Sequence, residues 1–216
     1  MGHGPRAPVV PSGGRVTPGS KLTYEEFLAW CGEDTWAEWV NGEVLMVSPA
    51  SDRHQALRAF LESVMGIYSQ ERGFGRVLGA PFQMRLPEPI HSGREPDVLF
   101  IASAHLSRLK EAYLEGPADL VVEIISPESR LRDRGEKFAE YQMGGVGEYW
   151  LLDPERRDAD FCRLDERGRY RLSEPDRGGW YESVTLPGFR LKVDWLWQIP
   201  LPRVLDVVRE LGLLGG

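Results

Sequence analysis

Cysteine is scarce in this chain, which has only Cys31 and Cys162 among 216 residues. Two thiols are too few for a thiolate metal cage, and neither lies in a recognisable catalytic motif. A metal-independent hydrolase that uses Cys31 or a serine therefore has no motif behind it. We expect both cysteines to be reduced, packed thiols of a cytoplasmic protein.

Long hydrophobic runs are also missing. No apolar run approaches the roughly 20 residues that a bilayer-spanning helix needs, so the sequence predicts no transmembrane segment. The first residues, MGHGPRAPVVPSGGRVTPGS, lack the apolar region of a secretory signal. They are rich in Gly and Pro, and we expect residues 1–20 to form a disordered tail.

The chain has no excess of basic residues. It carries 26 Lys and Arg against 33 Asp and Glu, for a net charge of −7. Proteins that coat nucleic acid non-specifically depend on Lys and Arg to neutralise phosphates, so this composition disfavours that class. A nuclease is still compatible with this net charge, because a divalent cation offsets part of the negative charge of an active site. Local basic density occurs at Arg130, Arg132, Arg134 and Lys137, and again at Arg163, Arg167, Arg169 and Arg171.

What remains is the composition of one globular domain, with 42% hydrophobic and 27% charged residues. Periodicity and capping signals predict helices over residues 22–30, 51–71, 104–114, 129–143 and 202–214. Strands are expected at 36–40 and 44–47, which form a hairpin around Asn41-Gly42, and at 76–86, 96–101, 120–125 and 148–153. Residues 159–172 are expected to form a further hairpin that turns at residues 166–168, and residues 184–193 to form one or two short strands. Because helices and strands interleave, we predict one α/β domain with a mixed sheet.

Two acidic residues stand out because they lie in apolar runs typical of strands. Asp97 opens PDVLFI, and Glu123 lies within DLVVEII. A carboxylate in such a run is costly to bury unless it is paired or bound to a cation. If the two strands pair, both carboxylates can bind one Mg²⁺ or Mn²⁺, with the backbone carbonyl of Ile124 or Ile125 as a third oxygen ligand.

A helical face follows these strands. Asp133, Lys137 and Tyr141 are each four residues apart, so they share one side of the predicted helix. Lys137 can orient an attacking water or stabilise a charged transition state, or it can form a structural ion pair with Glu123. Tyr141 can position water or phosphate through its hydroxyl, or its ring can simply pack between helix and sheet.

Paired carboxylates, a lysine and a sheet edge are the components of a metal-dependent phosphodiesterase site. A nuclease is therefore the leading hypothesis. Ser126, just before Pro127, can hydrogen-bond a metal-bound water or cap the next turn. Glu95 is predicted to point to the opposite strand face from Asp97, away from the site, and Asp153 to form a turn.

The segments PDVLFI, DLVVEIISPESR and DRGEKFAEYQMGGVGEYWLLDP together resemble the bacterial Uma family of restriction-endonuclease-like proteins, within the PD-(D/E)XK nuclease superfamily. The resemblance extends to AEWVNGEVLMVSPAS, followed by His54, and to LPGFRLKVDWLW, and so covers residues 22–197. It implies a restriction-endonuclease-like mixed β-sheet flanked by helices, with additional β-hairpins, over residues 21–200. Residues 201–216 then form a C-terminal helix and tail.

The resemblance also implies roles for individual residues. Asp97 matches the acid of the PD element, and Glu123 matches the first acid of the (D/E)XK element. The lysine expected two residues after Glu123 is absent, and Lys137 looks like its relocated counterpart. Glu38 resembles an upstream acid that contributes to the site, although an exposed hairpin glutamate is an alternative. His54 also matches a family position, where it is equally compatible with a cap or a structural histidine.

The leading hypothesis is thus a cytoplasmic Mg²⁺- or Mn²⁺-dependent DNA endonuclease with Asp97, Glu123, Lys137, Tyr141 and Glu38 at its site. A homodimer is plausible because nucleases that cut both strands often pair two sites. The alternative is an inactive nuclease-fold module for binding or oligomerisation, favoured by the acidic charge and the displaced lysine. Metal binding separates the two hypotheses.

Overall fold

The computed structural model describes residues 21–31, 35–46 and 50–213. The tail predicted for residues 1–20 lies outside this part of the chain, as do the last three residues of the predicted C-terminal segment. Within the described ranges, no helix combines the length and the apolar character that crossing a membrane requires.

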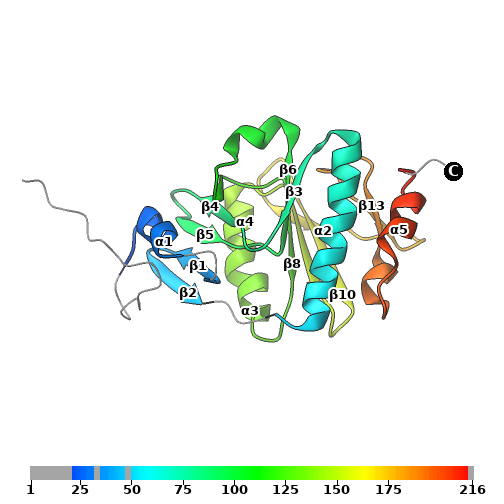
Figure 1. Cartoon of the computed structure of the whole chain (residues 1–216), viewed down its shortest axis with the longest axis horizontal. Helices are drawn as coiled ribbons and strands as arrows, with labels where there is room; N and C mark the ends of the chain where they lie inside the picture. The colour runs from blue at the N-terminus through cyan, green and yellow to red at the C-terminus, as the bar shows by residue number, and fades with distance from the viewer. Residues whose placement is uncertain (1–20, 32–34, 47–49, 214–216) are drawn as a thin grey trace, which may run out of the picture.

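Helices and strands interleave along the chain (Figure 1). The helical elements are α1 (Tyr24–Trp30), α2 (Asp52–Arg72), α3 (Arg130–Arg132), α4 (Phe138–Gly144), α5 (Val204–Glu210), the 3₁₀ helices η1 (Ser103–Arg108) and η3 (Val193–Trp197), and a π-helical turn η2 (Asp133–Lys137). The strands are β1 (Ala37–Val40), β2 (Glu43–Met46), β3 (Gly75–Gly79), β4 (Gln83–Leu86), β5 (Ser92–Arg94), β6 (Val98–Ala102), β7 (Tyr113–Glu115), β8 (Leu120–Ile124), β9 (Glu148–Asp153), β10 (Asp158–Leu164), β11 (Tyr170–Leu172), β12 (Trp180–Glu182) and β13 (Arg190–Lys192).

The central sheet is mixed, as the sequence predicts. Its six strands run in the order β11-β10-β9-β8-β6-β3. Strand β8 pairs in parallel with β9 and antiparallel with β6. A parallel pair needs a crossover between its strands, and the helical segment from α3 to α4 supplies it.

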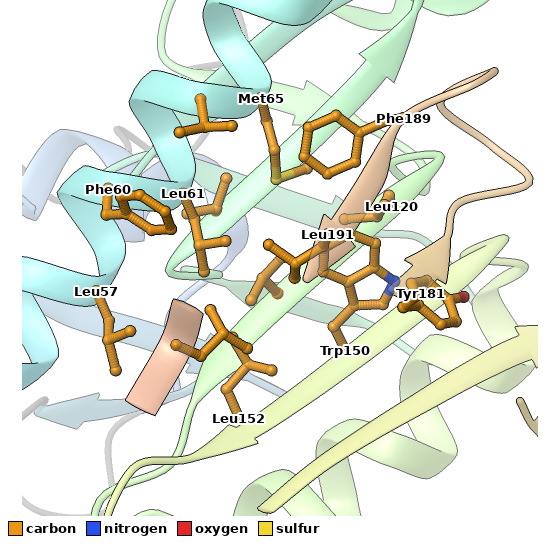
Figure 2. Packing of buried hydrophobic residues seen from close by; sticks show 14 of the residues in the cluster. Leu57, Phe60, Leu61, Met65, Leu120, Trp150, Leu152, Tyr181, Phe189 and Leu191 are labelled. Atoms are coloured by element: carbon orange, nitrogen blue, oxygen red, sulfur yellow. The ribbon is translucent and has the colours of Figure 1, made fainter. Parts of the chain in front are cut away.

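Each face of this sheet is covered by its own apolar core. On one face, Val98, Val122 and Trp150 pack with α2, α5 and the β12-β13 hairpin. Figure 2 shows this packing. The rings of Trp150 and Tyr181 meet edge-on, with their centroids 5.3 Å apart. On the other face, Val121 and other strand residues pack with α4 and with the second sheet. Alternation along β8 thus points Glu123 toward α4, because Val121 and Ile125 share that face.

The second sheet has five strands in the order β2-β1-β5-β4-β7. Its β1-β2 hairpin turns at Asn41 and Gly42, whose φ angles of 51° and 90° are those that a tight hairpin turn requires. Helix α1 packs against this hairpin and begins with a capping box between Thr23 and Glu26. The predicted hairpin is confirmed.

Two predicted elements are wrong. Residues 76–86 are not one strand, because β3 belongs to the central sheet and β4 to the second sheet. Pro81 lies between them and has no N–H to donate to a ladder, so the chain changes sheets there. The helix predicted over 104–114 is only the short 3₁₀ helix η1, followed by β7, which pairs in parallel with β4.

Helix α5 provides a matched test of packing. The sequence predicts that Leu205 and Val208 both face inward, but Leu205 is 55% exposed and Val208 is 1% exposed. We expect Val208→Ala to lower the free energy of unfolding by about 2 kcal/mol, because it removes buried methyl groups. Leu205→Ala should change it by less than about 0.5 kcal/mol. Urea titrations of both variants check this, and equal losses would contradict the observed orientation.

Candidate active site

The antiparallel pairing of β6 with β8 brings the two strand acids together. Val98 lies opposite Val122, so Asp97 and Glu123 follow as neighbours on the opposite face of the sheet. One oxygen of Asp97, Oδ2, accepts a hydrogen bond of 2.7 Å from the backbone N–H of Ile124. The convergence that the sequence predicts for these two carboxylates is therefore present.

Lys137 lies between three carboxylates. Its Nζ is 2.8 Å from Glu123 Oε1, 2.9 Å from Glu38 Oε1 and 3.7 Å from Asp133 Oδ1. The lysine ends the π-helical turn η2, which adds a residue to the helical turn facing the sheet. Gly135, which lowers helix propensity, lies within this turn. The ion pair of Lys137 with Glu123 thus exists, and it is combined with a second one.

Glu38 enters this cluster from β1 and is 1% exposed. The interpretation of Glu38 as an exposed hairpin glutamate is therefore wrong. Its Oε2 accepts a hydrogen bond of 3.0 Å from the fully buried Arg94, which also donates to Glu140. Burial by itself would raise the pKa of Glu38, but Lys137 and Arg94 outweigh it and lower that pKa to about 2. Glu38 is consequently ionised and can hold Lys137 in place.

The charges on Glu123 and Lys137 depend on each other. Burial raises the pKa of Glu123, and the favourable charge of Lys137 only partly offsets this because Asp133, Asp97 and Glu38 repel a further negative charge. The pKa of Lys137 is also raised: burial opposes its charge, and the surrounding carboxylates more than compensate. The lysine is thus fixed as a cation, whereas ionisation of Glu123 would be favoured by an additional positive charge nearby.

Tyr141 lies behind Glu123. Its side chain is fully buried, and its hydroxyl donates a hydrogen bond of 2.8 Å to Glu123 Oε1. The ring meets that of Tyr149 edge-on, with centroids 5.0 Å apart. The ring of Tyr141 packs at the helix–sheet interface, as one of the two alternatives predicts. Its hydroxyl binds a site carboxylate.

The acidic side chains of the site line a cleft of about 630 Å³. It lies between the β1-β2 hairpin, the start of α2 and the segment that leads from β8 into α3. Five predicted site positions line it: Glu38, Asp97, Glu123, Ile124 and Lys137. Tyr141 is not among the lining residues, so the structure places it one layer deeper.

Comparison with known proteins shows the family of the chain. The model of the Uma2 family, described as "Putative restriction endonuclease", matches residues 24–194. The chain belongs to the Uma2 family. This confirms the resemblance that its motifs indicate, and none of the curated proteins compared with the chain matches it.

A solved structure shows the same fold. It is a crystal structure from Anabaena variabilis, described as a putative nuclease belonging to DUF820. It is 15% identical to this Uma2 chain over 82% of this chain and 97% of the other, with a TM-score of 0.67. The predicted restriction-endonuclease-like α/β fold is thereby confirmed.

His54 contributes to the site, although its motif left the role open. Its Nε2 is 3.2 Å from Asp97 Oδ2, and it projects from the first turn of α2, where Ser51 caps the helix. Its Nδ1 is buried without a hydrogen-bond partner in the described part of the Uma2 chain. The only sequence signal for His54 was its place in the family pattern, because nothing local links α2 to the start of β6.

The position of Glu95 differs from the one that the sequence predicts. Predicted to face away from the site, it lines the cleft and accepts a hydrogen bond of 2.8 Å from Gln83. Residues two apart in an extended strand share a face, so alternation itself places Glu95 on the side of Asp97, and the expectation was wrong. Burial raises the pKa of Glu95 to about 7, with the Gln83 bond opposing and the charge of Glu38 adding to the rise.

The two remaining side chains near the strand ends have structural roles. Ser126 accepts a hydrogen bond from the N–H of Ser129, whose hydroxyl oxygen accepts one from the N–H of Ser126. This reciprocal cap favours the turn interpretation of Ser126. Asp153 accepts a hydrogen bond of 3.1 Å from the N–H of Arg156, as expected of a turn former.

The donor set fits a hard divalent cation. Asp97 Oδ1 and Glu123 Oε2 have no hydrogen-bond partner among the described residues, and both side chains line the cleft. No group of three His, Cys, Asp or Glu side chains able to hold a metal occurs in the described ranges. Mg²⁺ is nevertheless commonly held by one or two carboxylates, with water and substrate phosphate completing its shell. Two free carboxylate oxygens are therefore sufficient protein donors.

Proposed function

We propose that this Uma2 protein is a metal-dependent DNA endonuclease that hydrolyses phosphodiester bonds with Mg²⁺ or Mn²⁺. The observation that carries the proposal is the meeting of Asp97 and Glu123 beside Lys137 in an open cleft. The family description and the nuclease title of the Anabaena protein support it.

Each site residue has a role that follows from its contacts. Asp97, Glu123 and the backbone carbonyl of Ile124 would hold the cation, which when bound supplies positive charge to the phosphoryl oxygens. Lys137 uses one donor on Glu123 and one on Glu38, and its ammonium group has a third N–H for the attacking water or a phosphoryl oxygen. Glu38 and Tyr141 act as positioning residues, for Lys137 and Glu123 respectively.

Cleavage of supercoiled plasmid and of single-stranded DNA tests the proposal. We expect nicking or linearisation with Mg²⁺ or Mn²⁺ and none with EDTA. Glu123→Gln protein, purified in parallel, should be inactive because an amide is a poorer ligand than a carboxylate. Cutting that persists in EDTA or in the variant would contradict the proposal and indicate a different site or a contaminant.

His54 provides a more selective test. We expect His54→Ala to weaken Mn²⁺ binding by about 10- to 100-fold, because a partner that orients a metal ligand is lost. Isothermal titration calorimetry measures the affinity. Gln55→Ala, at the adjacent position of the same cleft, is the matched control and should bind Mn²⁺ like the wild type. Equal affinities for all three proteins would show that His54 does not position Asp97.

An inactive module remains the second candidate. It is favoured by the ion network of Lys137, Glu38 and Glu123, which is buried and would be stable as a purely structural unit. Calorimetry with Mg²⁺ and Mn²⁺ separates the candidates, since a module without turnover needs no cation at Asp97. The predicted homodimer and cytoplasmic location stay predictions, and sedimentation velocity tests the former.

A further inference from the structure

One wall of the cleft is apolar and exposed. Trp36 and Met46, from the β1-β2 hairpin and its edge, line the cleft and are 42% and 66% exposed. Residues 37 and 39 face the buried cluster beneath α1, so alternation turns Trp36 to the same side as Glu38. A tryptophan thus stands in the solvent-filled cleft next to the candidate catalytic acids.

A cation with free hydrogen-bonding capacity lies in the same cleft. The Nε of Arg132 is 4.0 Å from Glu38 Oε2 and 3.9 Å from Asp133 Oδ1, and this buried nitrogen has no hydrogen-bond partner among the described residues. By contrast, Arg53 and Arg58, which also line the cleft, donate to backbone carbonyls. Arg132 is therefore the lining arginine best able to bind an added anion such as a phosphate.

Phosphate contacts alone would give weak binding here. Acidic side chains outnumber basic ones in the cleft lining, and the whole chain carries a net charge of −7. Affinity for nucleic acid from charge neutralisation is correspondingly small. Stacking of a base on an aromatic ring supplies affinity that does not depend on net charge. A paired base inside a duplex presents no free face to Trp36, whereas an unpaired base does.

We propose that the cleft binds an unpaired nucleotide of a nucleic acid strand, with its base on Trp36 and a neighbouring phosphate on Arg132. This inference rests on the proposed nuclease function and specifies its substrate class as single-stranded nucleic acid or a single-stranded region within a duplex.

Binding, measured apart from cleavage, tests the inference. Fluorescence anisotropy of labelled oligothymidylate, oligouridylate and a hairpin duplex would be recorded with the full chain and Ca²⁺, a divalent cation that also takes oxygen ligands, in place of Mg²⁺. We expect the single strands to bind more tightly than the duplex, and the two single-stranded probes distinguish DNA from RNA. Trp36→Ala should weaken single-strand binding by roughly tenfold or more, and Trp36→Phe should retain most of it.

Controls keep the outcomes distinct. Leu131→Ala removes another exposed apolar side chain that does not line the cleft, and it should bind like the wild type. Arg132→Gln should weaken single-strand binding and reduce its salt dependence. Unchanged single-strand binding by Trp36→Ala, or duplex binding as tight as single-strand binding, would overturn the inference. Metal-dependent cutting of plasmid or of single-stranded DNA by the wild type reports separately on the nuclease function, so a failure of either proposal is recognisable.

Discussion

Replacement of Lys137 by methionine is expected to abolish metal-dependent cleavage and to lower the free energy of unfolding by about 3–5 kcal/mol. The loss of stability follows from burial, because Lys137 is 2% exposed and is the nearest cation to Glu123. Methionine fills similar volume but leaves the Glu123 carboxylate without a counter-charge. The loss of cleavage follows from the missing ammonium group beside the two strand acids.

A second substitution separates these two effects. In Lys137→Met/Glu123→Gln, the unpaired carboxylate becomes a neutral amide that can still accept a hydrogen bond from Tyr141. We expect this double variant to recover on the order of 1–2 kcal/mol of the lost stability while remaining inactive. Lys110→Met, at an exposed position, should stay within about 0.5 kcal/mol of the wild type.

Urea unfolding followed by circular dichroism, with plasmid cleavage in parallel, measures both properties of these variants. A Lys137→Met protein that is destabilised but still cuts DNA would leave the lysine a structural role only. Full stability in that variant would instead contradict the ion network described for Glu38, Lys137 and Glu123.

Asp97→Asn is expected to lose cleavage activity without losing stability. We expect cleavage to fall by at least about a hundredfold, because an uncharged amide is a poor ligand for a hard cation. The carbonyl oxygen of asparagine can still accept the hydrogen bond from the N–H of Ile124. Stability should be unchanged or slightly higher, because removing one negative charge relieves repulsion of Glu123.

The matched control for Asp97→Asn is Glu128→Gln, an exposed acid that lines the same cleft. It should leave cleavage within a factor of about two of the wild type, because the electrostatic effect of an exposed charge is screened by water and salt. Cleavage assays over a Mn²⁺ titration distinguish weaker binding of the cation from slower chemistry. Equal activities for the two variants would remove Asp97 from the proposed site.

Positioning residues were harder to predict than the acids they hold. Asp97 and Glu123 were visible because a carboxylate in an apolar run is anomalous by itself. His54 and Arg94 give no such signal: the first lies on an amphipathic helix and the second in a polar segment. Their roles exist only because α2 packs beside β6, which brings His54 to Asp97, and β5 pairs with β1, which brings Arg94 to Glu38.

The sequence by itself determined the local features of this protein. The Asn41-Gly42 turn, the Thr23 cap and the alternation around Glu123 each depend on sterics or periodicity within a few residues. The family motifs likewise indicated the fold, which comparison confirmed.

Only the tertiary structure decided how distant segments meet. It placed Glu38 of β1 on Lys137, turned Glu95 into the cleft and divided residues 76–86 between two sheets. The physical reason is that these contacts depend on the packing of whole sheets and helices around shared apolar cores. Such packing is selected by the sum of many weak interactions between segments far apart in the chain, and no short stretch of sequence contains it.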